Sequence, residues 1–381
     1  MKNAGNFIKA GLSLTLFCSV LFIACDRRIS TPSSDSPNLN DNYDYLKVQE
    51  SGKTRNITEF IKDGSRDGLS NKSVQLGRIL FYDKKLSINN TISCASCHKQ
   101  SLAFADNVNF STGFGNLLTT RNSMSILNPV NNNNMFWDSR ASSPLELSLM
   151  PVFNHIEMGM ENDQMLVTKL SKTSYYPDLF EDAFGDRTIT REKISKAVTQ
   201  FLNCLFSKES KFDQGLQNNF ANFTPLELYG KQLFFSDQLK CSECHSGTNF
   251  SAPDAPGSPY GGSTFGNDAS NPRGTANIGL DVSYKDNGRG NGKFKIPSLR
   301  NIELTGPYMH DGRFTTLEQV INHYSEGIQN HPNLDEKFRD GMKAKKLNLS
   351  ENDKVALIAF LKTLTDKNLI TNPKFSDPFK N

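Results

Sequence analysis

An all-α fold is predicted for this chain of 381 residues, arranged as two tandem domains with long irregular loops. Three observations lead to this prediction: an internal repeat, helical periodicity in several segments, and no convincing alternation of the kind that marks strands. The repeat pairs QLGRILFYDKKLSINNTISCASCH at residues 75–98 with LYGKQLFFSDQLKCSECH at residues 228–245. Each copy has the pattern of an apolar helix and a turn before a short cysteine motif, so each copy predicts one domain.

The N-terminal segment has the pattern of an export signal. A basic start is followed by an apolar run over residues 11–24, which is short for a membrane-spanning helix. The run ends in FIAC, similar to a bacterial lipobox, which predicts a signal peptide over residues 1–24 and lipidation of Cys25. Lipoboxes usually carry Leu at the position of Phe22, so cleavage by ordinary signal peptidase is the alternative.

The domain organisation follows from composition and from the repeat. A polar stretch rich in Ser, Pro and Asn predicts a flexible tether over residues 25–66. The two domains are then expected over residues 67–222 and 223–372, with the boundary at a helix-start signal, Thr224 followed by Pro225.

Two further segments have helical periodicity. Apolar residues fall on one face of residues 191–207, and residues 350–366 begin with Ser350 as a helix N-cap and continue amphipathically. Between Gly247 and Gly292 the chain is rich in Gly, Asn, Ser and Pro without periodicity, which predicts a long surface loop.

The cysteine motifs indicate the cofactor. The chain has seven cysteines, and four of them lie in two CxxCH motifs: Cys94, Cys97 and His98, then Cys241, Cys244 and His245. A zinc site or a redox-active dithiol does not need a histidine directly after the second cysteine. A c-type haem does, because both thiols attach to the haem and the next residue ligates the iron. Two such motifs therefore predict two covalently bound haems in two cytochrome c-like domains.

Charge patterning gives no sign of a nucleic-acid partner. The formal net charge of +3 is small and decides nothing, since two haems would add four propionate carboxylates. No charge run suggests a nucleic-acid-binding face, so nucleic acid is not an expected partner. Attachment of c-type haem takes place outside the cytoplasm, which agrees with the export signal and predicts a periplasmic protein.

Two longer segments resemble a known family. SMSILNPVNNNNMFWDSRASSPLELSLMPVFNHIEMGM at residues 123–160 is similar to the inter-haem region of bacterial di-haem cytochrome c peroxidases, and KIPSLRNIELTGPYMHDGRFTTLEQVINHY at residues 295–324 is similar to their second domain. The resemblance extends to the MauG-type di-haem enzymes. It implies a peroxide-binding haem at His98 and an electron-accepting haem at His245.

The same resemblance implies roles for residues outside the two motifs. Trp137, the chain's single tryptophan, matches a tryptophan that lies between the haems. Asn122, Thr305 and Pro307 match positions that hold a calcium ion, the last two through backbone carbonyls, and oxygen ligands suit this hard cation. Without the resemblance, these residues have ordinary packing, turn and capping interpretations.

Glu157 matches the carboxylate beside the peroxide-binding haem. Cleavage of peroxide needs a group that takes a proton from one oxygen and returns it to the other, and a carboxylate can do both. His155 is close enough in sequence to compete for this role, although the resemblance favours Glu157. Pro151 and Met158 are expected to shape the same pocket.

Two positions depart from the best-known peroxidases. Phe114 stands where a histidine in those enzymes blocks the peroxide-binding iron, so that iron is expected to be open without prior reduction. Tyr324 stands at the position of the methionine ligand of the second haem, as in the MauG-type branch. The rival ligand is Met309, and adjacent His323 cannot face the same iron as Tyr324 because successive helical residues point in different directions.

The resemblance implies an enzyme that reduces hydrogen peroxide to water with electrons from a cytochrome c or a similar redox protein. MauG-like oxidation of a protein or organic substrate through highly oxidised haem iron is the alternative. A non-catalytic di-haem electron carrier comes from a different class, and a zinc-binding structural protein is a remote third. Family members are often dimers, so a homodimer is an expected assembly, and membrane contact is expected through the lipid anchor alone.

Overall fold

Helices carry most of the regular structure in this computed structural model, which describes residues 36–61, 64–131, 134–251, 274–283 and 285–380. These described residues belong to one unit. The predicted signal peptide, Cys25 and the middle of the predicted 247–292 loop lie outside the described residues. No helix in the described ranges is long and apolar enough to cross a membrane.

Short helices and three small sheets follow one another along the chain. The helices are α1 (Asn71–Tyr82), α2 (Cys94–Cys97), α3 (Pro144–Leu147), α4 (Asp163–Ser171), α5 (Tyr176–Phe184), α6 (Arg191–Cys204), α7 (Lys211–Gly215), α8 (Pro225–Phe234), α9 (Cys241–Cys244), α10 (Leu317–Asn322), α11 (Glu351–Lys362) and α12 (Lys367–Thr371). The strands are β1 (Lys47–Glu50), β2 (Lys53–Asn56), β3 (Thr275–Ala276), β4 (Phe294–Lys295), β5 (Arg339–Asp340) and β6 (Lys343–Ala344).

The strands correct the prediction of an all-α fold. They pair as three two-stranded antiparallel sheets, β1 with β2, β3 with β4, and β5 with β6. The first is a hairpin whose two turn residues, Ser51 and Gly52, have positive φ angles of 50° and 77°, as a tight hairpin turn requires. Strands of two to four residues are too short for alternation to be seen in the sequence.

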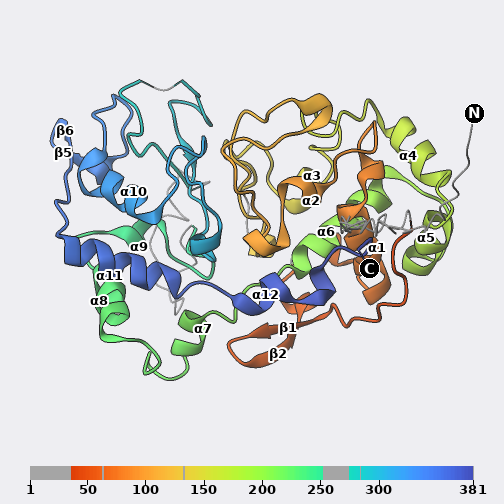
Figure 1. Cartoon of the computed structure of the whole chain (residues 1–381), viewed down its shortest axis with the longest axis horizontal. Coiled ribbons are helices and arrows are strands. Elements are labelled where there is room, and N and C mark those ends of the chain that lie inside the picture. Colours follow the sequence, from red (N-terminus) through yellow and green to blue (C-terminus); the bar gives the residue numbers. More distant parts are fainter. Residues whose placement is uncertain (1–35, 62–63, 132–133, 252–273, 284, 381) are drawn as a thin grey trace, which may run out of the picture. The chain divides into compact units, whose positions relative to one another are not determined.

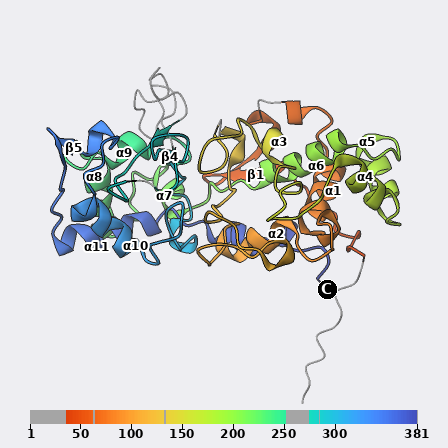
Figure 2. The same ribbon diagram turned by 90° about the horizontal axis from the view of Figure 1, so that it is seen from above.

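Two helix pairs carry the internal repeat. Helix α1 packs on α6, and α8 packs on α11 (Figures 1 and 2). A β-carbon at Gly77 of α1 would lie 1.9 Å from the carbonyl oxygen of Ala197 in α6, and one at Gly230 of α8 would lie 1.9 Å from that of Ala356 in α11. Both crossings are therefore so close that only glycine fits at them.

Helix starts follow the predicted signals. Thr224 caps α8 and Ser350 caps α11, each with a reciprocal capping box that satisfies backbone N–H groups at the helix start. Helix α6 is capped by Thr190 and buries the apolar face that the periodicity predicted, with Ile194 and Phe201 fully buried.

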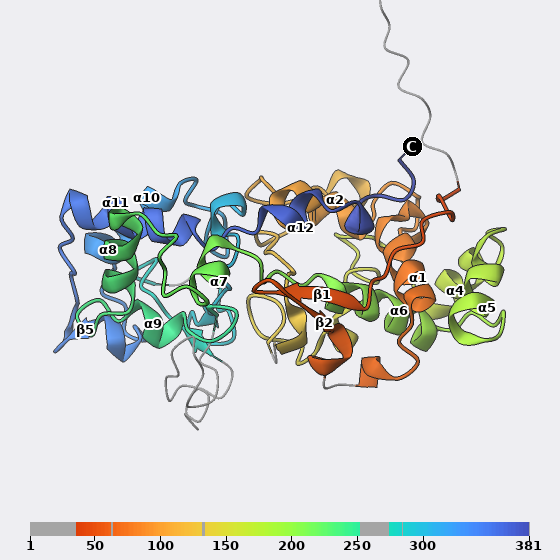
Figure 3. The ribbon, with the colours of Figure 1, turned by 90° about the horizontal axis from the view of Figure 1, so that it is seen from below.

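The predicted tether is shorter than residues 25–66. The hairpin of β1 and β2 lies within it, and Figure 3 shows this hairpin near α6. Tyr45, Val48 and Ile57 are buried in the first apolar cluster, which includes residues of α1 and α6. The backbone N–H of Ser51 also donates to the carbonyl oxygen of Lys208 at 3.0 Å. Residues from about Tyr45 onward are thus part of the folded unit.

The two apolar clusters do not follow the predicted boundaries. The first ends along the chain at Phe206, and the second, which surrounds α8 and α11, begins at Phe212, ahead of the expected boundary at residue 222. After α11 the chain returns to the first cluster, where Leu369 and Phe375 are buried. Helix α12 lies beside the first CxxCH segment (Figure 3), since the Gln100 side chain donates to backbone oxygens of Leu369 and Asn372.

Candidate functional site

Each CxxCH motif forms a four-residue helix at the edge of its own cavity. The first cavity, of about 440 Å³, is lined by Cys97, His98, Glu157 and Trp137 among others. The second, of about 210 Å³, is lined by the second motif and by Tyr324. The predicted site residues are therefore distributed over two neighbouring cavities, as two haem sites require.

The motif histidines are oriented in the same way. Nδ1 of His98 donates to the carbonyl oxygen of Phe104 at 2.9 Å, and Nδ1 of His245 donates to that of Phe250 at 3.0 Å. Phe104 and Phe250 both have positive φ angles, 58° and 52°. Because the Nδ1 proton is used in this bond, Nε2 carries the lone pair that a metal needs.

Burial keeps these groups in the form that suits haem attachment. It lowers the pKa of His98 and lowers that of His245 to about 4, so both imidazoles are neutral near neutral pH. Among the described residues, the four motif cysteines are free thiols, not disulfides. Free thiols beside an oriented, neutral imidazole at a cavity form a donor set that fits a covalently bound haem.

Glu157 is placed to act inside the first cavity. Burial raises the pKa of its carboxyl group, and the positive charge of Arg140 lowers it by less. The carboxylate makes no hydrogen bond to any residue that the structure describes, so it is available to a ligand in the cavity. The backbone N–H of Glu157 donates to the carbonyl oxygen of Asn154 at 3.2 Å, and this hydrogen bond fixes the backbone at Glu157.

Phe114 and His155 both lie outside the first cavity. The Phe114 N–H donates to the carbonyl oxygen of Glu157 at 2.9 Å, and the Phe114 ring packs so closely on Gly159 that a β-carbon there would lie 2.7 Å from it. His155 is exposed and lines a separate surface groove with Arg191. Met158 is buried in the first apolar cluster, whereas Pro151 lines the cavity as expected.

One wall belongs to both cavities. The residues that line both, called the shared wall below, are Asn122, Met124, Ser125, Leu127, Trp137 and Lys295. Trp137 is 8% exposed, and its indole N–H donates to the carbonyl oxygen of Asn122 at 2.9 Å. Its own carbonyl oxygen accepts from the N–H of Lys295 at 2.8 Å. Trp137 thus lines both cavities, and its place between two haems stays a prediction.

An ion-pair network holds the backbone on either side of Trp137. Arg121 donates to Asp138 at 2.6 Å and forms two bonds to Asp286, at 2.6 and 2.8 Å. Since Asn122 and Trp137 are joined by the indole bond, residues 121–122 are connected to residues 137–138 twice. Bidentate arginine–carboxylate pairs fix geometry as well as charge.

Tyr324 comes from a π-helix in the second cavity. Helix α10 continues into this π-helix, His323–Gly327, a rare form that is frequent at functional sites. Burial raises the pKa of Tyr324, and its hydroxyl makes no hydrogen bond to any described residue. Met309 lines the same cavity. His323 points elsewhere, with Nε2 at 3.0 Å from the carbonyl oxygen of Ile278.

The three calcium candidates line the same cavity. Asn122, Thr305 and Pro307 all line the second cavity. Calcium takes about six to eight oxygen ligands, more than these three residues supply. Within the described ranges, no group of three or more His, Cys, Asp or Glu residues could hold a metal ion. The calcium site therefore stays a prediction.

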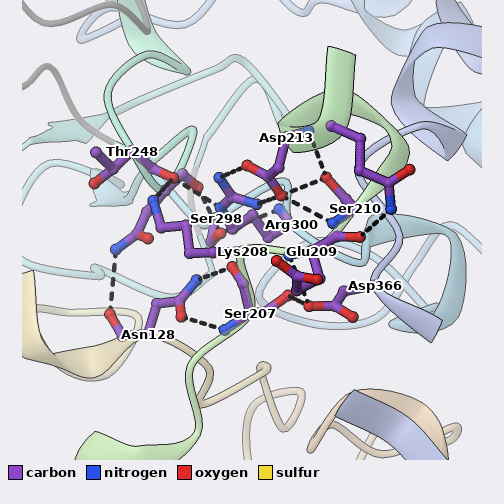
Figure 4. A network of polar contacts seen from close by, with 12 residues as sticks. Asn128, Ser207, Lys208, Glu209, Ser210, Asp213, Thr248, Ser298, Arg300 and Asp366 are labelled. Atoms are coloured by element: carbon purple, nitrogen blue, oxygen red, sulfur yellow. Dashed lines mark hydrogen bonds and ion pairs between the residues drawn. The ribbon is translucent and has the colours of Figure 1, made fainter. Parts of the chain in front are cut away.

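A buried polar network supports the loop behind His245 (Figure 4). Arg300 and Asp213 are fully buried and joined by two bonds of 2.8 Å. Arg300 and Lys208 each donate to the carbonyl oxygen of Thr248 at 2.7 Å. Thr248 lies two residues before Phe250, the acceptor of the His245 bond, so this network fixes the loop that orients His245.

Sequence reasoning missed three contributors to these sites. Phe104 and Phe250 act through backbone oxygens, which no residue pattern reveals. Lys295 is 7% exposed in the shared wall. The sequence held a signal for its burial, because Lys295 stands among apolar residues in FKIP, within the segment that resembles the family.

Comparisons with known proteins agree with this geometry. The family model described as di-haem cytochrome c peroxidase matches residues 71–221. A methylamine utilization protein MauG of Methylorubrum extorquens is 31% identical over 80% of this chain and 82% of its own length. A cytochrome c551 peroxidase of Nitrosomonas europaea is 34% identical over 76% of this chain and 79% of its own.

A solved structure extends the similarity to the fold. The crystal structure of a MauG-like protein associated with microbial copper homeostasis has a TM-score of 0.72 and 32% sequence identity, covering 89% of this chain and 99% of that one. Membership in the matched family implies two c-type haems, which the two CxxCH cavities fit. The chain belongs to the di-haem cytochrome c peroxidase and MauG family.

Proposed function

We propose that this protein is a di-haem peroxidase that reduces hydrogen peroxide to water, with electrons from a cytochrome c or a similar redox protein. The observation that carries the proposal is the position of Glu157, a carboxylate with no hydrogen-bond partner among the described residues, in the same cavity as His98. An electron carrier needs no such acid–base group beside its haem.

Glu157 supplies the proton transfer in this proposal. The haem at His98 would bind peroxide and exchange electrons with it. The Glu157 carboxylate takes the proton from the oxygen that binds and gives it to the oxygen that leaves as water. Because burial raises its pKa, the protonated form of Glu157 is a more accessible state than for an exposed glutamate.

Trp137 provides the connection to the second haem. It lines both cavities, and three contacts hold its segment: the indole bond to Asn122, the backbone bond from Lys295, and the Arg121–Asp138 pair. A rigid aromatic side chain in this position is suited to passing electrons from the His245 site to the His98 site.

MauG-like oxidation of a protein or organic substrate is the second candidate. Tyr324 favours it, because this buried phenol lines the second cavity and has no hydrogen-bond partner among the described residues. A phenolate ligand would stabilise more oxidised iron than a methionine would. The relatives are named both as peroxidases and as MauG proteins.

Peroxide turnover tests the proposal. The holoprotein is mixed with hydrogen peroxide in a stopped-flow instrument, with and without reduced cytochrome c. We expect donor oxidation in proportion to peroxide consumed, starting from the fully oxidised protein, since Phe114 does not enter the first cavity. Two low-spin haems that ignore peroxide in every redox state would instead indicate an electron carrier.

The expected location and assembly complete the proposal. We propose a periplasmic protein that is anchored through lipid on Cys25 and can form a homodimer. The export pattern at the N-terminus supports the location, and the frequent dimers among family members support the assembly. Labelling cells with a radioactive fatty acid tests the anchor, because the unmodified protein should incorporate the label and a Cys25→Ala variant should not. Sedimentation of the purified protein tests the dimer.

A further inference from the structure

Lys295 is a buried cation whose role the proposed reaction does not use. It lies in β4, is 7% exposed, and lines both cavities. Among the described residues, its ammonium group makes one hydrogen bond, a long one of 3.4 Å to the carbonyl oxygen of Ile296. Among the described residues, no carboxylate lies within ion-pair distance of it. Burial lowers its pKa to about 8, which still leaves the amine largely charged at neutral pH.

An uncompensated buried ammonium is costly. Removing an unpaired charge from water is strongly unfavourable, so buried lysines are normally paired. The other cations of the first cavity are already paired: Arg121 with Asp138 and Asp286, and Arg140 with Asp138 at 2.8 Å. Lys295 is thus the cation of these walls that lacks an acidic partner in the described structure.

An anion that enters the cavities would supply the partner that Lys295 lacks among the described residues. A c-type haem carries two propionate carboxylates, and two haems bring four such groups into the space that Lys295 lines. We propose that the ammonium group of Lys295 binds haem propionate at the shared wall and places a fixed positive charge beside Trp137. The inference rests on the two haems of the proposed function and does not depend on peroxide turnover.

Such a charge has a direct electrochemical consequence. A positive charge held in a poorly solvated site stabilises the reduced iron relative to the oxidised iron, because the oxidised iron carries one more positive charge. Lys295 therefore raises the reduction potential of the haem whose propionate it binds. The backbone N–H of Lys295 donates to the Trp137 carbonyl oxygen, so the Lys295 side chain starts beside the residue that lines both cavities.

Potentials of the holoprotein test the inference. Lys295→Met removes the charge and keeps the length of the side chain, whereas Lys295→Arg keeps the charge. Lys293→Met is the matched control, because Lys293 is two residues away and lines neither cavity. In optically monitored redox titrations, we expect Lys295→Met to lower the potential of at least one haem. The Lys295→Arg and Lys293→Met proteins should match the unmodified protein.

Several outcomes would overturn the inference. Unchanged potentials in Lys295→Met with both haems attached would show that the ammonium binds no propionate. A changed spin state would show that Lys295 is an iron ligand instead. If Lys295→Met yields no holoprotein, Lys295→Gln replaces it. Failure of all neutral variants while Lys295→Arg assembles normally would support the need for charge, and failure of Lys295→Arg as well would contradict it. Absence of peroxide turnover in the unmodified holoprotein, together with the expected shift in Lys295→Met, would count against the proposed function alone.

Discussion

The two CxxCH segments have nearly the same surroundings on the side of their histidines. Behind each histidine, the phenylalanine whose carbonyl oxygen accepts the histidine bond packs its ring on a second phenylalanine. This second ring packs on a third phenylalanine, which lies on the helix that crosses the first helix of the repeat. The ring-centroid distances are 6.1 and 5.3 Å for the Phe104–Phe81 and Phe81–Phe201 pairs, and 6.1 and 5.0 Å for the Phe250–Phe234 and Phe234–Phe360 pairs.

The opposite sides of the two cavities differ. The first receives Glu157, from the turn-rich segment between the two copies of the repeat, and the second receives Tyr324, from the π-helix that follows α10. The repeated part of the sequence thus builds two equivalent haem attachments. The residues proposed to set the chemistry of each haem come from segments that the repeat does not contain.

Replacing Glu157 should have the largest effect on this contrast. Glu157→Gln removes the proton acceptor and keeps the shape of the side chain, so peroxide turnover should fall roughly a hundredfold or more. Both haems should remain attached. Steady-state turnover with reduced cytochrome c measures the loss, and the absorption of the denatured protein counts the haems.

His155→Ala is the control for this prediction, because His155 lies outside the cavity and turnover should change by no more than about twofold. A normal rate in Glu157→Gln together with loss of activity in His155→Ala would reverse the assignment.

The pH profile gives a second check. Glu157 must be deprotonated to accept a proton, so turnover falls as the pH drops through its pKa. Because burial raises that pKa, the acid limb should lie above the ordinary glutamate range.

Tyr324→Met should make the second haem resemble that of the methionine-ligated peroxidases. We expect a near-infrared sulfur-to-iron band in the oxidised variant and a higher reduction potential of this haem, since methionine ligation raises haem potentials. Met309→Leu is the matched control and should leave ligation unchanged. The band in the unmodified protein, and its loss in Met309→Leu, would show that Met309 is the ligand.

Local patterns predicted the parts of the fold that depend on neighbours in sequence. The helix starts at Thr224 and Ser350 were predicted because a few adjacent residues determine them. The β1–β2 hairpin and the return of Leu369 to the first cluster were not, because their stability comes from contacts distant in sequence. Polar composition at the N-terminus concealed the apolar side chains of Tyr45 and Ile57.

The candidate site shows the same division. Thiols and imidazoles have a fixed spacing in the sequence, so both haem attachments could be predicted from residues alone. Glu157, Trp137 and Tyr324 required the family resemblance, since a single carboxylate, indole or phenol carries no spacing signal. The backbone acceptors of the two histidines and the burial of Lys295 could be found only in the structure, because each depends on how segments of the chain pack together.

The two helix crossings offer a direct comparison of the repeat copies. Gly77→Ala and Gly230→Ala each place a β-carbon against a backbone carbonyl that cannot rotate away. Alanine favours a helix by about 1 kcal/mol, but overpacking costs about 1 to 3 kcal/mol, and more for a rigid neighbour. Both variants should therefore lose stability by similar amounts in thermal unfolding of the holoprotein. Gly64→Ala, with no atom within 4 Å of its β-carbon, should have no such cost. Tolerance at one crossing alone would show that the copies are not equivalent.

The smallest expected effect concerns the connection between the two cavities. Asp286→Asn removes one of the two acidic partners of Arg121 and leaves the bond to Asp138, so the segment that holds Trp137 should loosen without breaking. A partly exposed ion pair contributes up to about 1 kcal/mol, which corresponds to about a fivefold effect at most. We expect electron transfer between the haems to slow within that limit, measured by rapid reduction of the His245 haem, while both potentials stay unchanged.

Asp281→Asn is the matched control, because it removes an acidic partner of Arg313 from the same stretch of chain without touching Arg121. Equal slowing in both variants would mean that the loop, and not the Arg121 pair, affects transfer. No slowing in Asp286→Asn would show that the indole bond to Asn122 positions Trp137 without help from Asp286.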